Sequence, residues 1–179
     1  MLDQILKDLK NEVKFGYLKK KHAFRYPSLA SVEEGKPIQR TVVLRDTTDD
    51  FDLIIYTDER SNKIHQFETN PESSLLFYNH KKLLQVKIEG KMQLIRSGSE
   101  YENYWSRVQG KSQKDFITQL PPGTPIDNPD HVDYKEDEHH FCLLKLVPES
   151  MEYLELKRPN HIRAKFDKSD NWKGQFLNP

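Results

Sequence analysis

Stretches in which apolar and polar residues alternate recur along this chain, and they constrain its fold more than any other feature. Between residues 84 and 95, Leu84, Val86 and Ile88 alternate with polar residues, which is typical of a strand that buries one face. The other segments with strand patterns are PSLASV, IQRTVVLR, FDLIIYT, SSLLFYN, HHFCLLKLV, MEYLELK, HIRAKF and WKGQFL. Turn sequences such as EEGKP and DTTDD separate them. The pattern predicts a mostly antiparallel sheet that curls or closes into a barrel, with Gly90 marking a bulge or sharp bend.

Short helices are expected around this sheet, which makes the chain an α+β protein. Apolar residues at helical spacing predict an amphipathic N-terminal helix over residues 2–21. A second helix is expected between Ser61, which is a plausible N-cap, and Pro71, which stops it. A third is expected over residues 97–108. The length suits one domain, so we expect a single domain over residues 1–179.

Residues 111–138 show little periodicity and include the turn-rich sequence LPPGTPIDNPD. A loop of this length is uncommon inside a compact domain, and such loops tend to be lids, interface arms or mobile segments. We therefore expect a long loop over residues 111–138, with one of these three roles.

The charge balance argues against binding to nucleic acids and to membrane surfaces. The chain has 28 basic and 28 acidic residues, so it lacks the basic excess typical of proteins that bind nucleic acids or membrane surfaces. No apolar run approaches the roughly 20 residues of a membrane span, and the charges among the first leucines argue against a secretory signal. Cys142 is the only cysteine, so no intrachain disulfide forms. We expect a cytoplasmic protein without nucleic-acid or membrane partners.

Histidine, cysteine and tryptophan often bind ligands, but in this chain we expect them to have packing roles instead. His139 and His140 adjoin in an expected strand, so their side chains point to opposite faces and no metal site is expected. Cys142 is expected to be a small core residue. Trp105 and Trp172 are expected to be packing aromatics.

Cations and hydroxyls gather at the ends of two adjacent strand patterns. The residues concerned are Arg40, Thr57, Ser61 and Lys63. If the strands are antiparallel, these side chains approach the start of the helix after residue 61, where unpaired backbone amides carry partial positive charge. Guanidinium, ammonium, hydroxyl and amide donors together suit a phosphate monoester. The alternative is a set of ordinary surface salt bridges to nearby acids, which are Asp46, Asp49, Asp58 and Glu59.

The order of motifs between residues 40 and 90 resembles the FMN-binding split barrel of the pyridoxamine 5'-phosphate oxidase family. The motifs are RTVVLR at 40–45, YT at 56–57, SNK at 61–63, NP at 70–71, LLF at 75–77 and QVKIEG at 85–90. The C-terminal segment that begins with HIRAKF also resembles the closing strands of that family. The resemblance implies an antiparallel split β-barrel with peripheral short helices. It also implies a homodimer with FMN at its interface.

The resemblance further implies which residues contact FMN. Arg40 and Lys63 would hold the phosphate, helped by the hydroxyls of residues 57 and 61, and Gln85 would hydrogen-bond the cofactor. The full implied set is Arg40, Val42, Val43, Leu44, Arg45, Tyr56, Thr57, Ser61, Asn62, Lys63 and Gln85. The family oxidase has two basic residues after the serine, and Asn62 stands in place of the first. This loss is expected to weaken phosphate binding rather than abolish it, because a charged hydrogen bond contributes about 1.5–3 kcal/mol.

The substrate side of the family pattern matches only in part. The residues that the resemblance assigns to substrate are Arg45, Arg107, His161 and Arg163. For Arg107, the alternative is a surface ion pair with Glu100 or Glu102. Arg45 is also a candidate to stabilise reduced flavin, or else to pair with an acid, either Asp46 or Asp50.

The resemblance therefore implies an FMN-dependent oxidoreductase that oxidises or reduces a small molecule. The flavin carries the redox chemistry in such proteins, so no side chain is assigned as a nucleophile. The alternative is a non-catalytic protein that binds flavin or haem on the same barrel.

Overall fold

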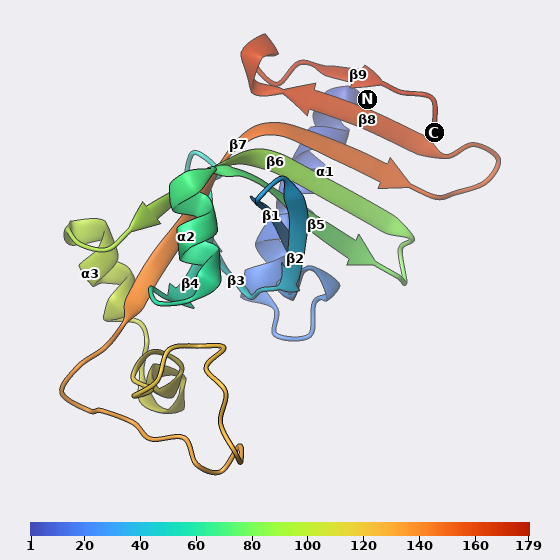
Figure 1. Ribbon diagram of the computed structural model, residues 1–179. Coiled ribbons are helices and arrows are strands. Elements are labelled where there is room, and N and C mark those ends of the chain that lie inside the picture. Colours follow the sequence, from blue (N-terminus) through green and yellow to red (C-terminus); the bar gives the residue numbers. More distant parts are fainter.

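The computed structural model describes residues 1–179, and its central feature is one antiparallel sheet of nine strands. The strands are β1 (Ser28–Glu33), β2 (Lys36–Thr41), β3 (Leu44–Thr47), β4 (Leu53–Asp58), β5 (Glu72–Asn79), β6 (Leu84–Ile95), β7 (Phe141–Glu155), β8 (Ile162–Asp167) and β9 (Gly174–Phe176). Their order is β2-β1-β5-β6-β7-β4-β3, and β8 pairs with β7 and β9. The α-helices are α1 (Leu2–Leu18), α2 (Asn62–Thr69) and α3 (Ser99–Trp105). Figure 1 shows the sheet strongly curled, with α1 behind it and α2 in front. The predicted α+β class and curled antiparallel sheet are confirmed.

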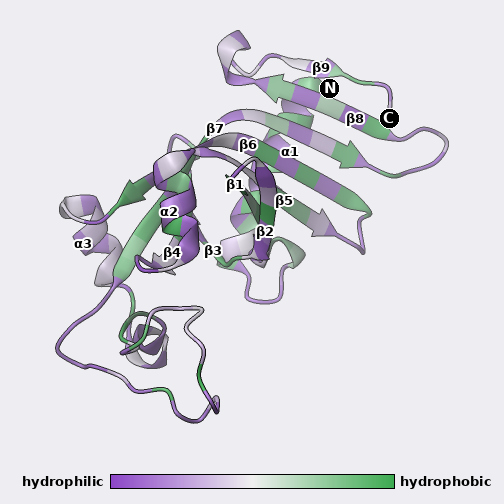
Figure 2. Ribbon diagram, viewed as in Figure 1, coloured by the Kyte–Doolittle hydropathy of each residue, from purple (hydrophilic) through white to green (hydrophobic).

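The alternation of residue types along the strands builds the core. In β6, Leu84, Val86 and Ile88 are at most 3% exposed, whereas the residues between them are partly exposed. Figure 2 shows the same alternation of hydrophobic and hydrophilic residues along the long strands. Leu9 and Val13 of α1 are fully buried and join the same core cluster. The inward face of the sheet and the apolar stripe of α1 therefore form one continuous core.

The pairing of β6 with β7 shifts register at Gly90, which confirms the predicted bulge. A Cβ atom at this position would overlap the carbonyl oxygen of Val147 and the Cα atom of Pro148. The segments HHFCLLKLV and MEYLELK were expected as two strands, but β7 runs without a break from Phe141 to Glu155. The expectation was wrong because Pro148 lies opposite Gly90 at the bulge, where proline is tolerated within a sheet.

The N-terminal helix is shorter than expected. It ends at Leu18 rather than at residue 21, and Lys19 adopts an extended backbone with φ of −115°. Gly16 lies directly against the backbone of Phe24, whose fully buried ring contacts Phe77. The chain leaves the helix early because Phe24 must turn back into the core. None of the helices combines the length and the apolar character needed to cross a bilayer.

A second apolar cluster lies between α3 and the outer faces of β4 and β7. Its buried members are Ile54, Tyr101, Tyr104, Val108, Phe116, Phe141 and Leu143. Trp105 packs edge-on against Phe116 with ring centroids 6.1 Å apart, so its predicted packing role is confirmed. The expected 111–138 loop is mostly irregular, but the 3-10 turn η2 (Gly110–Phe116) overlaps its start. It projects away from the sheet at the lower left of Figure 1.

Replacing Gly90 with alanine is expected to lower the free energy of unfolding by about 2–3 kcal/mol. The added methyl group would collide with the β7 backbone, and overpacking of this kind forces the strands apart. Urea unfolding of the protein without added flavin measures the change. Gln93→Ala, at an exposed position on the same strand, is the matched control. A loss below about 0.5 kcal/mol, the range of an ordinary surface substitution, would contradict the assigned packing.

Candidate functional site

The end of β4 and the start of α2 bring an ammonium group and two hydroxyls together. The Nζ atom of Lys63 donates to Thr57 Oγ1 and to Ser61 Oγ, each at 3.0 Å. The two hydroxyl oxygens lie 3.2 Å apart. Thr57 and Ser61 are only 7% and 6% exposed. Three of the four residues predicted to converge therefore touch one another.

Ser61 occupies the N-cap position of α2, as predicted from the sequence. Its side chain, however, makes no capping hydrogen bond to the helix backbone. The hydroxyl is engaged with Thr57 and Lys63 instead. The first amides of α2 are thus left without the side-chain acceptor that an N-cap usually provides, and such amides attract anions.

Arg40 of β2 reaches the same helix from the neighbouring strands. Its guanidinium donates to Ser31 Oγ at 2.7 Å and to Gln66 Oε1 at 2.6 Å. Ser31 and Gln66 are 2% and 4% exposed, and they also bond to each other at 2.6 Å. These two neutral residues were missed by the sequence analysis. One signal was available for Gln66, because it follows Lys63 by one helical turn.

The cations of this cluster have no carboxylate partner. Neither Arg40 nor Lys63 forms an ion pair, so the alternative of ordinary surface salt bridges is not observed. Burial lowers the pKa of the Lys63 ammonium below its ordinary value, and the nearby charge of Arg40 lowers it further. Burial also lowers the pKa of Arg40. An anion bound between the two cations would relieve both the desolvation and the repulsion.

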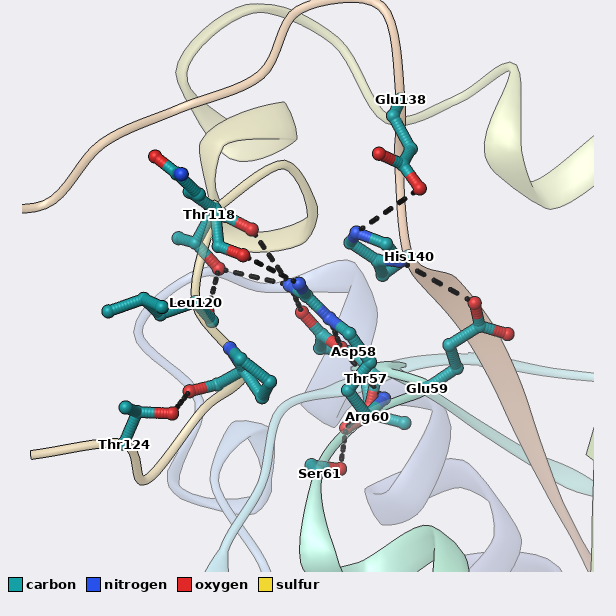
Figure 3. A network of polar contacts seen from close by, with 12 residues as sticks. Thr57, Asp58, Glu59, Arg60, Ser61, Thr118, Leu120, Thr124, Glu138 and His140 are labelled. Atoms are coloured by element: carbon teal, nitrogen blue, oxygen red, sulfur yellow. Dashed lines mark hydrogen bonds and ion pairs between the residues drawn. The ribbon is translucent and has the colours of Figure 1, made fainter.

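Asp58, which adjoins Thr57 in the chain, is paired with a different cation, as Figure 3 shows. Asp58 forms a bidentate pair with Arg60, whose Nη2 lies 2.7 Å from Asp58 Oδ2. Arg60 also donates to the carbonyl oxygens of Thr118 and Gln119 at 2.9 and 3.2 Å. It therefore holds the projecting loop against the β4–α2 turn. Because its guanidinium is engaged in this way, Arg60 does not supply the positive charge that the site loses by having asparagine at position 62.

His139 and His140 lie just before β7 rather than within the expected strand, and only His140 joins this network. His140 faces Glu59, with Nδ1 3.6 Å from the carboxylate, and lies 4.0 Å from Glu138 (Figure 3). His139 instead stacks on Trp105, with ring centroids 4.0 Å apart.

Arg45 lies at a register shift between β3 and β4, on the outer side of the sheet. Its guanidinium carbon lies 5.3 Å from the centroid of the Tyr56 ring, and its Nε atom is buried without a hydrogen-bond partner. It forms no ion pair with Asp46 or Asp50, so that alternative is wrong. Burial raises the pKa of Tyr56 above its ordinary value, and the charges of Arg45 and Arg107 oppose that shift.

Arg107 is paired, but not with the acids expected. Its Nη1 donates to Asp46 Oδ2 at 3.0 Å, and Tyr104 donates its hydroxyl to the same oxygen at 3.3 Å. Glu100 instead bonds Lys145. The expected alternative of a local pair was wrong because Asp46, which lies in β3 at its register shift with β4, meets Arg107 just beyond the end of α3, although the two residues are 61 positions apart in the chain.

The remaining predicted FMN contacts divide into two groups. Val42 and Leu44 turn their side chains into the core, at 9% and 0% exposure, and the Val42 amide donates to Pro27 O at 3.0 Å. Val43 is half-buried between them and Asn62 is exposed. Gln85 lies apart from all of these, at the opposite end of β6, paired with Leu154.

His161 and Arg163 lie at the same far end as Gln85. Arg163 pairs with Leu154 across β8 and β7, and its Nε and Nη2 donate to Glu152 Oε1 at 3.0 and 2.9 Å. His161 accepts the Lys157 amide on Nδ1 at 3.1 Å. Within one chain the structure does not bring these residues to the Lys63 cluster. The ten steps of β6 from Gln85 to Ile95 alone span about 33 Å of strand.

Comparison with known proteins agrees with the family resemblance found in the sequence. A family model described as "Pyridoxamine 5'-phosphate oxidase, FMN-binding domain" matches residues 3–96. The "Pyridoxine/pyridoxamine 5'-phosphate oxidase 2" of Arabidopsis thaliana is 30% identical over 147 residues, which are 74% of each chain.

Solved structures with the same fold support this result. A pyridoxamine 5'-phosphate oxidase-related, FMN-binding protein from Nostoc punctiforme superimposes with a TM-score of 0.78 at 25% identity, covering 97% of this chain and 96% of the other. PhzG from Burkholderia lata, in complex with tetrahydrophenazine-1-carboxylic acid, superimposes with a TM-score of 0.77 at 16% identity, covering 98% and 92%. The predicted split-barrel fold is confirmed.

Replacing Arg60 with alanine is expected to destabilise the protein by about 2 kcal/mol, because it leaves the buried Asp58 carboxylate without its cation. It should also speed proteolysis within residues 117–138, since the contacts to Thr118 and Gln119 are lost. Urea unfolding and limited proteolysis measure the two effects. Arg96→Ala, which breaks an exposed pair with Glu68, is the control. Equal proteolysis of the two variants would argue against Arg60 as the residue that holds the loop.

Proposed function

Because this chain belongs to the pyridoxamine 5'-phosphate oxidase FMN-binding family, we propose that it binds FMN at the β4–α2 junction and acts as an FMN-dependent oxidoreductase on a small molecule. The observation that carries the proposal is the Lys63 ammonium held between two buried hydroxyls, with Arg40 beside it and no carboxylate in contact. We further propose that it works as a homodimer in the cytoplasm, where its single buried cysteine remains reduced.

The cluster suits the phosphate of FMN in charge and in donor geometry. A phosphate monoester carries close to two negative charges at neutral pH and has three acceptor oxygens. Lys63 and Arg40 supply two positive charges, and Thr57 and Ser61 supply two hydroxyls. The first amides of α2 add further donors. Buried hydroxyls held by strand and helix lose little freedom on binding, so the site is preorganised.

The residues beyond the phosphate site suit the flavin ring. In the proposed complex, residues 42–45 pass their backbone beside the ring, because the side chains of Val42 and Leu44 already fill the core. FMN, when bound, supplies the redox chemistry. Arg45, with an unpartnered Nε, is placed to stabilise negative charge that develops beside it.

The position of Gln85 supports the proposed homodimer. Gln85 lies far along β6 from the phosphate cluster, so contact with the same FMN requires a second copy of the chain. Beside it, β5 exposes two large apolar side chains, Leu76 at 38% and Tyr78 at 50%. In the proposed dimer this face packs against the partner, so that Gln85 lies beside the FMN bound by the partner.

The alternative of a non-catalytic binding protein draws on a separate observation. Arg107 and Arg163, both assigned to substrate, are occupied by Asp46 and Glu152. Reduction of the purified protein separates the two functions. Bleaching of a flavin spectrum by NADH, NADPH or pyridoxamine phosphate supports the enzyme. Bound flavin that none of these reduces supports storage or sensing, and a Soret band indicates haem.

The double variant Arg40→Ala, Lys63→Ala is expected to lose FMN affinity by at least a hundredfold. Each charged hydrogen bond to the phosphate contributes about 1.5–3 kcal/mol, so two contribute about 3–6 kcal/mol. Fluorescence titration with FMN measures the affinity, and circular dichroism verifies the fold. A control with the same charge change is Lys20→Ala, Lys21→Ala, at exposed positions. Unchanged FMN affinity in the first variant would refute the phosphate assignment.

FMN affinity is also expected to fall as the pH rises, beginning below pH 10.5. The pKa of Lys63 in the free protein is lowered from its ordinary value of 10.5, so its ammonium loses the proton at a lower pH than an exposed lysine. Above that lowered pKa, binding a phosphate requires uptake of a proton, which weakens affinity as pH increases. Lys63→Arg should flatten this dependence, because arginine stays protonated. A parallel decline in both proteins would exclude Lys63 as the titrating group.

A further inference from the structure

The projecting loop carries a cleft lined by apolar side chains and two carboxylates. The cleft has a volume of about 260 Å³, large enough for an aliphatic side chain. Leu120 and Ile126 line it and are 49% and 45% exposed. Asp115 and Asp133 line it as well. Exposed apolar side chains that gather around a cleft are typical of a binding surface.

The cleft has a fixed position in the molecule. The two sides of the loop are joined by the Gln119 amide, which donates to the carbonyl oxygen of Asp133 at 2.8 Å. The Arg60 guanidinium joins the loop to the β4–α2 turn through the carbonyl oxygens of Thr118 and Gln119. Arg60 directly precedes Ser61 of the proposed phosphate site. The cleft therefore lies on the same side of the molecule as the proposed FMN site.

The loop is strongly acidic. Residues 111–138 hold seven acidic and three basic residues, which gives this segment a net charge of −4. Of its acids, only Glu138 forms ion pairs. The remaining carboxylates, including the two that line the cleft, are available to a basic partner.

The turn between β7 and β8, residues 156–161, has the complementary character. Its sequence LKRPNH holds two basic residues and no acid, and all six residues are exposed. Leu156, at its start, is 40% exposed. Lys157 reaches the Glu155 carboxylate only at 3.9 Å, and Arg158 forms no ion pair. An exposed leucine followed by two cations matches an apolar cleft lined by carboxylates.

The turn and the cleft cannot meet within one chain. The Leu156 amide donates to the carbonyl oxygen of Leu83 at 3.0 Å, and Leu154 pairs with Gln85, so the turn lies at the Gln85 end of the sheet. Figure 1 shows it at the right, opposite the projecting loop at the lower left. In the proposed homodimer, Gln85 of one copy lies beside the FMN of the other. The turn of one copy is thereby brought to the loop of the other.

We infer that the β7–β8 turn of one copy docks in the cleft of the other, with Leu156 in the cleft and the two basic residues against Asp115 and Asp133. The inference rests on the proposed function, because it requires the proposed homodimer. The twofold symmetry of a homodimer repeats the contact, so each chain gives one turn and receives another. Each contact borders a proposed FMN site, whose wall then comes from both chains.

Charge reversal on one side of the contact tests the inference. Lys157→Glu, Arg158→Glu is expected to raise the dimer dissociation constant at least about tenfold, because like charges then face one another. Adding Asp115→Lys, Asp133→Lys to the same chain restores opposite charges. The combined variant should return to within about threefold of the unaltered protein, because the two sets of residues are coupled. Sedimentation velocity over a concentration series measures the constants.

Two controls accompany these variants. Lys20→Glu, Lys21→Glu makes the same charge change at exposed positions and should leave the dissociation constant unchanged. Leu120→Cys, Leu156→Cys should be joined between chains by a short bis-maleimide, whereas either single variant should not. The native Cys142 is buried and does not compete. Equal weakening by the lysine control, or no restoration in the combined variant, overturns the inference.

The cross-linking result separates the docking from the cofactor site. A dimer that gives no such link leaves the cleft to another partner and overturns the inference. A monomeric protein overturns both the inference and the proposed homodimer. FMN titration of the same samples tests the cofactor on its own. A linked dimer that binds no FMN would refute the flavin assignment and keep the docking, whereas FMN binding by an unlinked dimer would do the reverse.

Discussion

The Lys63 ammonium group lies between the hydroxyls of Thr57 and Ser61, and the arrangement of the proposed cofactor site depends on this contact. It requires β4 to end, and α2 to begin, within a few residues. Thr57 is fixed by pairing with Cys142 of β7, and Ser61 is fixed as the first residue before the helix. Sheet pairing thus determines the spacing of the two hydroxyls, and Lys63 follows from the first turn of α2.

The positive charge of this cluster is available because the neighbouring acids are engaged elsewhere. Asp58 is next to Thr57 in the chain, but its carboxylate binds Arg60, which also reaches the projecting loop. Arg40 is oriented by the neutral side chains of Ser31 and Gln66 rather than by a carboxylate. On the outer side of β3 and β4, by contrast, Asp46 pairs with Arg107, and Arg45 has no carboxylate partner.

The sequence was sufficient for features that depend on local pattern. Alternation along β6 predicted the buried face, Gly90 predicted the bulge, and Ser61 predicted the start of α2. It was insufficient where a distant partner decides the outcome. The continuity of β7 depends on Pro148 meeting the bulge of another strand, and the Arg107 contact joins residues 61 positions apart.

The candidate site divides in the same way. The convergence of Thr57, Ser61 and Lys63 follows from spacing within one strand–turn–helix segment, and the sequence predicted it. Ser31 and Gln66 carry no charge and no motif, so only the packing of β1 against α2 discloses their contact with Arg40. Gln85, His161 and Arg163 were grouped with the site by resemblance, whereas the sheet places them at its other end. Their assignment therefore requires a second chain.

A crystal structure of the protein with FMN tests the central claim most directly. The account predicts phosphate oxygens within hydrogen-bond distance of Lys63 Nζ, Ser61 Oγ and the Arg40 guanidinium of one protomer. It also predicts a contact to the flavin from Gln85 of the other protomer. FMN bound with its phosphate away from Lys63, or held by one chain alone, would contradict it.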